Sequence, residues 1–150
     1  MPVIRAGHPR DLAEVAAIQA SSPEAAHWDA ADYLQYDFRV CLDQGRVAAF
    51  LVARRVAPDE SELLNLVVAP EFRRKGLARA LLQELLAAPA TPGQAEACPT
   101  RRSSLYLEVR ESNQAARNLY KSMGFQEVNI RQEYYQAPPE AAIVMKFHSC

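Results

Sequence analysis

The segment LYLEVRESNQAARNLYKSMGF, residues 105–125, contains an acid and a phenol in positions where they could transfer protons. Its first six residues alternate between apolar and polar, which predicts a strand, and the residues from 113 onward show helical periodicity. Glu108 stands at the end of this strand and Tyr120 in the helix. A carboxylate and a phenol can act as general base and general acid. Taken alone, Glu108 fits better as a solvent-facing strand residue and Tyr120 as a core residue, and the catalytic interpretation stays open beside these.

A second segment, LNLVVAPEFRRKGLARALL, has the layout of an anion-binding site. An apolar strand is followed by a turn, and Gly76 opens a helix whose first amide groups lack partners and favour negative charge. Arg73, Arg74 and Lys75 add positive charge at the helix end where a purely structural design favours acids. The spacing fits neither a P-loop nor a dinucleotide-binding turn. A solvated basic turn remains the alternative.

The elements that must position these residues mix strands and helices along the whole chain. Strands are predicted at 2–7, at 39–57 around a turn at 43–45, at 61–69, at 105–110, at 125–135 and at 141–147. Helices are predicted at 8–22, at 29–36 with Asp29 as N-cap, at 76–88 and at 113–123. The strand at 61–69 is apolar enough for burial on both faces. The fold class is α/β with a mixed sheet, in one domain over 1–150 with an irregular loop at about 89–103.

Composition sets limits on partners and location. The net charge of -1 and the pI near 6.3 provide no global positive field, so we expect neither direct nucleic-acid binding nor membrane binding. Three widely spaced cysteines argue against a disulfide framework and favour a reducing compartment. The N-terminus lacks the apolar run of a signal peptide and the scattered histidines do not suggest a metal site. We therefore expect a cytoplasmic protein without a metal.

Two motifs in this chain resemble those of a known enzyme superfamily. RRKGLA is similar to the Arg/Gln-x-x-Gly-x-Gly/Ala signature of the GCN5-related N-acetyltransferases (GNAT), and NQAARNLYKSMGF is similar to a second segment of the same superfamily. ELLNLVVAPEFRRKGLARALL, LEVRESNQAARNLYKSMGF and RQEYY together resemble the RimI-type enzymes, which acetylate the N-terminal alanine of a small-subunit ribosomal protein. The resemblance extends over nearly the whole chain, but the proline-rich loop at about 89–103 is longer than that family leads us to expect.

The resemblance implies a single-domain GNAT fold with a mixed, mostly antiparallel sheet, two splayed parallel central strands and flanking helices. Acetyl-CoA would lie between the splayed strands, and Asn113 matches a position that contacts it. The family's general base and general acid match Glu108 and Tyr120, and its peptide-binding side matches Tyr134 and Tyr135. The other implied acetyl-CoA contacts are the backbone groups of Leu66, Val67 and Val68 and the amides of Arg73, Arg74, Lys75, Gly76, Leu77 and Ala78.

The function implied by the resemblance is acetyl transfer from acetyl-CoA to a protein N-terminal α-amine, by direct attack in a ternary complex. An α-amine has a pKa of ~7.7–8.0 against ~10.4 for lysine, so one carboxylate suffices as a base. Neither Cys41 nor Cys98 stands near an activating base, which disfavours an acyl-cysteine intermediate. Two alternatives remain: a relaxed-specificity acetyltransferase acting on other N-termini, lysines or a small amine, and a non-catalytic acyl-CoA-binding sensor module.

Overall fold

The computed structural model describes residues 2–22, 28–87, 103–136 and 139–149. These residues divide into two compact units, which are described separately below: unit 1 is Met1–Arg54 with Leu64–Ala88, and unit 2 is Arg55–Leu63 with Pro89–Cys150. The predicted loop at about 89–103 lies outside the described residues except for Ser103, which begins a strand. Its irregularity and the extent of the single domain stay predictions.

A seven-stranded sheet has the order β1-β2-β3-β4-β5-β7-β6. Four pairs are antiparallel, β1 with β2, β2 with β3, β5 with β7 and β6 with β7, whereas β4 and β5 are parallel. The predicted α/β class with a mixed, mostly antiparallel sheet is confirmed. The strands are β1 (Val3–Ala6), β2 (Asp37–Asp43), β3 (Arg46–Ala57), β4 (Glu60–Val68), β5 (Ser103–Arg110), β6 (Gln126–Gln136) and β7 (Pro139–Ser149).

The helices of the described residues fall close to their predicted positions. Asp29 caps the second helix as predicted, because its carboxylate accepts a hydrogen bond from the Ala31 amide. This helix has 3₁₀ geometry, and the following strand begins two residues before the predicted position 39. The helical elements are η1 (Pro9–Asp11), α1 (Leu12–Ala20), η2 (Ala30–Gln35), η3 (Pro70–Phe72), α2 (Leu77–Ala87) and α3 (Gln114–Ser122).

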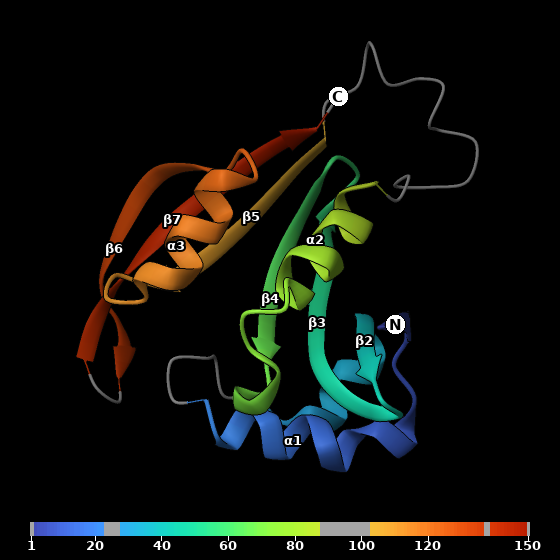
Figure 1. Cartoon of the computed structure of the whole chain (residues 1–150). Helices are drawn as coiled ribbons and strands as arrows, with labels where there is room; N and C mark the ends of the chain where they lie inside the picture. Colours follow the sequence, from blue (N-terminus) through green and yellow to red (C-terminus); the bar gives the residue numbers. More distant parts are fainter. Residues whose placement is uncertain (1, 23–27, 88–102, 137–138, 150) are drawn as a thin grey trace. The chain divides into compact units, whose positions relative to one another are not determined.

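The core of unit 1 joins α1 and α2 to the strands β2, β3 and the second half of β4. The apolar side of α2 buries Leu81 and Leu82 completely, which fixes the helix that begins after the basic turn. On the outer side of the same helix, Glu84 lies 3.8 Å from the guanidinium of Arg39 on β2. Figure 1 shows α2 beside β3 and β4, and α1 near the β4 end that leads into η3.

Strand β4 is not buried on both faces, so that prediction is wrong. Asn65 and Val67 are buried, whereas Leu64, Leu66 and Val68 are partly exposed. A continuous apolar run does not distinguish one covered face from two, and here only the odd-numbered residues face the core. The other face of β4 is therefore apolar and accessible in its second half.

Unit 2 consists of β5, β7 and β6 side by side, with α3 packed against them (Figure 1). The rings of Tyr120, Phe125 and Phe147 form a continuous aromatic cluster between α3 and the sheet, with successive centroids 5.5 Å and 5.3 Å apart. Gly124 makes the turn from α3 into β6 with a φ of 101°, a conformation that disfavours other residues.

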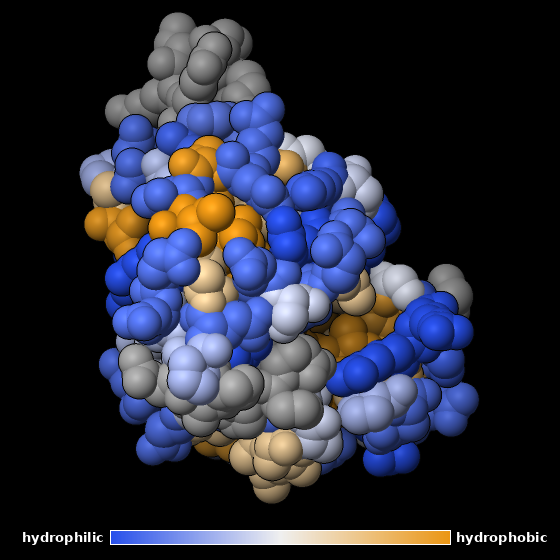
Figure 2. Space-filling view, turned by 90° about the vertical axis from the view of Figure 1, so that its left-hand side faces the viewer, coloured by the Kyte–Doolittle hydropathy of each residue, from blue (hydrophilic) through white to orange (hydrophobic). Residues whose placement is uncertain are grey.

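Strand β6 forms the edge of the sheet and carries exposed apolar side chains. Val128, Ile130 and Tyr134 are 51%, 50% and 38% exposed. The space-filling view shows a face on which apolar side chains are grouped among hydrophilic ones (Figure 2). None of the helices among the described residues is long and apolar enough to cross a lipid bilayer.

Candidate active site

Glu108 lies near the carboxyl end of β5, on the sheet face opposite the core. Along β5 the residues Leu105, Leu107 and Val109 are buried, and Glu108 alternates with them. Its side chain is 20% exposed, and its Oε1 atom accepts a hydrogen bond of 2.8 Å from Nη1 of Arg131. The acid predicted from the sequence is therefore accessible to solvent and held by a cation from β6.

A bulge in β6 brings Arg131 to this position. In the β6–β7 pairing, Arg131 lies opposite Ala142 and Tyr135 lies opposite Glu140. Between these two pairs, β6 therefore contains two more residues than β7. Within the bulge, Glu133 has a φ of 54°, which non-glycine residues rarely adopt. Bulges change the direction of side chains next to functional sites, and this one directs a group of polar side chains toward Glu108.

Tyr134 lies within the bulge and Tyr135 directly follows it, and both contact Glu108. A hydrogen bond to the Glu108 side chain, together with burial, raises the pKa of Tyr134 to about 12. Burial and the charge of Glu108 raise the pKa of Tyr135 to about 12, and its hydroxyl donates to the Glu108 carbonyl at 3.3 Å. The two rings pack edge to face with centroids 5.0 Å apart, and the Arg131 guanidinium lies 4.4 Å from the Tyr134 ring centre.

Arg110 and Glu140 complete the polar surroundings on the other side of Tyr135. The guanidinium of Arg110 lies 4.2 Å from the centre of the Tyr135 ring and 3.4 Å from the Glu140 carboxylate. Hydrogen bonds from the side chain and backbone of Ser112 hold the pKa of Glu140 below its ordinary value. Tyr135 is thus fixed from both sides, by Arg110 over its ring and by Glu108 at its hydroxyl.

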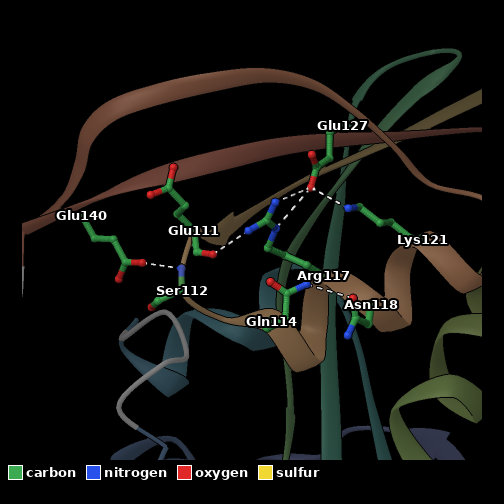
Figure 3. Close-up of polar contacts among 8 residues, drawn as sticks. All are labelled: Glu111, Ser112, Gln114, Arg117, Asn118, Lys121, Glu127 and Glu140. Atoms are coloured by element: carbon green, nitrogen blue, oxygen red, sulfur yellow. Dashed lines mark hydrogen bonds and ion pairs between the residues drawn. The ribbon is translucent and has the colours of Figure 1, made fainter.

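Helix α3, which carries Tyr120, is fastened to its surroundings through Arg117 (Figure 3). The Arg117 guanidinium donates to the Glu111 carbonyl at 2.7 Å and to the Glu127 carboxylate at 2.8 Å. Lys121 lies 3.4 Å from the same carboxylate, and these cations lower the pKa of Glu127. The start of β6 and the residue after β5 therefore fix the rotation of the helix, and with it the direction of Tyr120.

Tyr120 approaches the sheet from the face opposite Glu108. Its ring belongs to the aromatic cluster with Phe147, which pairs directly with Leu105 and so shares that residue's face of the sheet. Burial raises the pKa of Tyr120 well above its ordinary value, with a contribution from Tyr135. Tyr135, which contacts Glu108 and acts electrostatically on Tyr120, links the two predicted catalytic residues.

Asn113 has a structural role that its sequence position did not reveal. It is the N-cap of α3, and its side-chain oxygen accepts a hydrogen bond of 3.2 Å from the Ala116 amide. Such caps stabilise helices by about 0.5–2 kcal/mol. The predicted contact of Asn113 with a cofactor stays a prediction.

In unit 1, the basic turn has the backbone expected of an anion site. Phe72 and Leu77 are buried at its two ends, and Arg74 and Gly76 between them have left-handed φ values of 66° and 75°. The Ala80 amide makes the first helical hydrogen bond, to Gly76, so the amides of residues 77–79 precede the helical ladder. No acid occupies the first turn of α2. Alternating backbone conformations of this kind form concave sets of amides that bind anions.

The cations of the turn have different partners. Lys75 lies 3.6 Å from the Asp43 carboxylate and 5.2 Å from the centre of the Phe72 ring. Arg73 reaches the Ser22 hydroxyl at 3.4 Å. Arg74 is exposed. Lys75 thus has a carboxylate partner on β2, whereas all three cations were predicted to lie at one anion site.

The backbone of β4 presents its polar groups alternately to two edges. The Ala69 amide donates to the Ala48 carbonyl of β3 at 2.8 Å, so the backbone of Val67 also faces β3. Leu66 and Val68 therefore direct their amides and carbonyls to the opposite edge. There the Leu66 amide donates to Oδ1 of Asn65 at 3.1 Å, and the Val68 carbonyl accepts a hydrogen bond of 3.5 Å from Nε of Arg73. The predicted cofactor contacts of Leu66, Val67 and Val68 stay predictions.

Sequence reasoning missed Arg131, Arg110 and Glu140. Each lies close in the chain to a residue that was singled out, but no local pattern marks a partner across the sheet. Within the described ranges, the His, Cys, Asp and Glu side chains form no group of three or more that could hold a metal ion, and the expectation of a metal-free site stays a prediction.

The phenols of Tyr134 and Tyr135 have higher pKa values in the folded chain than in the unfolded chain. The free energy of unfolding should therefore depend on pH in the alkaline range. Tyr134 and Tyr135 have pKa values of about 12 in the folded chain, against ~10 when unfolded. Above about pH 10 the folded chain then binds more protons than the unfolded chain, so the free energy of unfolding decreases as pH rises. Urea titrations across this range should show a smaller decrease for Tyr134→Phe/Tyr135→Phe than for wild type. An equal decrease in the double variant and in wild type would contradict the raised pKa values of the two tyrosines.

Known proteins that are similar to this chain are acetyltransferases. Residues 10–125 match the acetyltransferase (GNAT) family. The chain is 43% identical over 103 residues to the [ribosomal protein bS18]-alanine N-acetyltransferase of Escherichia coli K12, covering 67% of this chain and 64% of that protein. It is 36% identical over 109 residues to the enzyme of the same name from Haemophilus ducreyi, covering 71% of this chain and 69% of that protein. The match to the first of these relatives thus spans a little less than two thirds of its length.

Solved structures show the same fold over a longer stretch. The ribosomal-protein-S18-alanine N-acetyltransferase from Escherichia coli superposes with a TM-score of 0.78 at 32% identity, covering 99% of this chain and 94% of that one. Ard1 from Thermoplasma volcanium superposes with a TM-score of 0.83 at 26% identity, covering 99% and 98%. The extent of the family match, together with these likenesses, shows that the chain belongs to the acetyltransferase (GNAT) family.

Proposed function

We propose that the chain transfers an acetyl group from acetyl-CoA to a protein N-terminal α-amine, with the N-terminal alanine of a small-subunit ribosomal protein as acceptor. The observation that carries the proposal is the partly buried Glu108 carboxylate, which Arg131 and two tyrosines surround at the end of β5. The names of relatives at 43% and 36% identity support the acceptor. A ribosomal acceptor would place the reaction in the cytoplasm.

Two groups of backbone atoms in unit 1 would hold acetyl-CoA. The turn from Arg73 to Ala78 offers left-handed backbone at Arg74 and Gly76 and helix amides without an acid beside them, which suits a pyrophosphate. The Leu66 carbonyl and the Val68 amide, on the edge of β4 that does not face β3, would suit the polar groups of the pantetheine arm. The partly exposed apolar face of β4 suits its methylene groups.

The chemistry requires two proton transfers and no enzyme nucleophile. The amine nitrogen attacks the thioester carbonyl carbon and loses a proton to Glu108, directly or through water. The carbon–sulfur bond then breaks, and the CoA thiolate takes a proton from Tyr120. Exchange with solvent after product release returns a proton to Tyr120 and removes one from Glu108. An amide of β4 would stabilise the negative oxygen formed between these steps. Burial raises the pKa of the Cys41 thiol, which makes an acyl-cysteine route through this residue unfavourable.

The acceptor class can be tested with two peptides. One begins with a free alanine and contains no lysine, and the other has the same sequence with a blocked N-terminus and one lysine. We expect acetylation of the first peptide to be faster, because a larger fraction of an α-amine is neutral at pH ~7.4. Mass spectrometry of both products measures the two rates. Equal rates would contradict N-terminal specificity.

The proton-transfer roles can be tested by substitution. Glu108→Gln should lower kcat about 10²–10⁴-fold, the usual contribution of a general base. Tyr120→Phe should lower kcat while the Kd of acetyl-CoA stays near the wild-type value. Glu111→Gln is the matched control for Glu108, because its carboxylate is exposed three residues further along. Wild-type kcat in Glu108→Gln or Tyr120→Phe would exclude that residue from catalysis.

The role of the basic turn can be tested with a matched pair of glycines. Gly45 and Gly76 have φ values of 76° and 75°, and an added Cβ would meet no atom within 4 Å at either one. Gly45→Ala and Gly76→Ala should therefore each lower the free energy of unfolding by about 1–2 kcal/mol. Only Gly76→Ala should weaken acetyl-CoA binding, by about tenfold or more, because it disturbs amides that would contact the phosphates. Unchanged acetyl-CoA affinity, measured by calorimetry, would contradict this assignment.

A further inference from the structure

Arg131 contacts the carboxylate that the proposed function makes the proton acceptor. Its Nη1 atom lies 2.8 Å from Oε1 of Glu108, and the side chains are 52% and 20% exposed. An ion pair this open to solvent contributes little to folding stability. A contribution to folding stability therefore does not by itself explain why Arg131 is held at the Glu108 carboxylate.

The bulge that presents Arg131 is a strained piece of backbone. Glu133, two residues after Arg131, has a φ of 54° within an interval where β6 has two extra residues relative to β7. The bulge also places Tyr134 beneath the Arg131 guanidinium, 4.4 Å from its ring centre. Strain of this kind persists where the surrounding structure requires it, and it occurs mainly at functional sites.

The charges around Glu108 show what Arg131 changes. Charged groups on this face, or acting on its tyrosines, include Glu62 on β4, Arg110 on β5, Glu140 on β7 and Lys146 on β7, which lies over the Tyr106 ring two residues before Glu108. Arg110 lies 3.4 Å from Glu140, so the carboxylate next to it is already compensated. The cation at the Glu108 carboxylate is Arg131. Its removal would leave the Glu108 carboxylate without this ion pair.

Amines reach the site in two forms that respond differently to these charges. At pH ~7.4, roughly 30% of an α-amine with a pKa of ~7.8 is neutral, against roughly 0.1% of a lysine side chain. An ammonium ion is attracted by an uncompensated carboxylate and repelled by a guanidinium, whereas a neutral amine gains or loses little. The net charge at Glu108 therefore decides how strongly the site distinguishes a neutral amine from an ammonium ion.

We propose that Arg131 makes the site selective for neutral amines, and so for protein α-amines over lysine side chains. The inference rests on the proposed acetyl transfer to an α-amine. Arg131 compensates Glu108, so a lysine ammonium ion gains little on entering, while a neutral α-amine enters without penalty. Glu108 still has a second carboxylate oxygen to accept the proton that the amine loses. Arg131 acts through the charge of Glu108, and it is a positioning residue for the reaction.

Arg131→Gln tests the inference with the two peptides described above, one offering an α-amine and the other a lysine. The ratio of KM for the lysine peptide to KM for the α-amine peptide should fall by about tenfold, the effect of one pKa unit on the bound amine. The fall should come mainly from a lower KM for the lysine peptide. Gln132→Ala, at an exposed neighbouring position, is the matched control and should leave the ratio unchanged.

A second substitution separates charge from structure. Arg131→Lys keeps the positive charge and should retain a ratio near that of wild type. If Arg131→Gln leaves the ratio unchanged or lowers both rates equally while wild type acetylates the α-amine peptide, the inference fails and the proposed function stands. If wild type acetylates neither peptide, both fail.

Discussion

The short parallel ladder between β4 and β5, which lies within unit 2, is the constraint that sets the position of Glu108. It pairs Glu60–Leu63 with Ser104–Leu107. Glu108 is the first residue of β5 after this ladder. In β4 the ladder is followed by Leu64–Val68, which belong to unit 1 and precede the basic turn in the sequence. A shift of this register by one residue would move Glu108 to the core face and bury a charge. The apolar alternation of β5 therefore fixes both the register and the accessibility of the acid.

The environment of Glu108 depends on an element without regular geometry. The β6 bulge places one guanidinium and two phenols around one carboxylate, and Arg110 holds Tyr135 from the other side. The phenols stay protonated because burial and the Glu108 charge raise their pKa values. The same charge thus favours neutral hydroxyl groups, which can donate hydrogen bonds to a peptide. A regular strand would alternate these side chains between two faces and separate them.

Local patterns were sufficient to predict the elements and several site residues, because strand alternation, helix periodicity and capping depend on neighbours in sequence. They placed Glu108 at a strand end and Tyr120 on a buried helical side. They did not predict that these two residues approach from opposite faces of the sheet, since periodicity does not say which face a helix covers. Arg131 was missed because its partner is 23 positions away. The left-handed Glu133 was missed because glutamate gives no signal for that conformation.

Calorimetry with a bisubstrate conjugate tests most directly whether the parts of the site serve one reaction. In this conjugate, CoA is joined through an acetyl linker to the α-amine of a peptide that begins with alanine. If acetyl-CoA and the α-amine occupy one site together, the conjugate should bind about 10²-fold more tightly than acetyl-CoA alone, as mimics of a reacting complex do. Binding no tighter than that of acetyl-CoA would contradict direct transfer in a ternary complex.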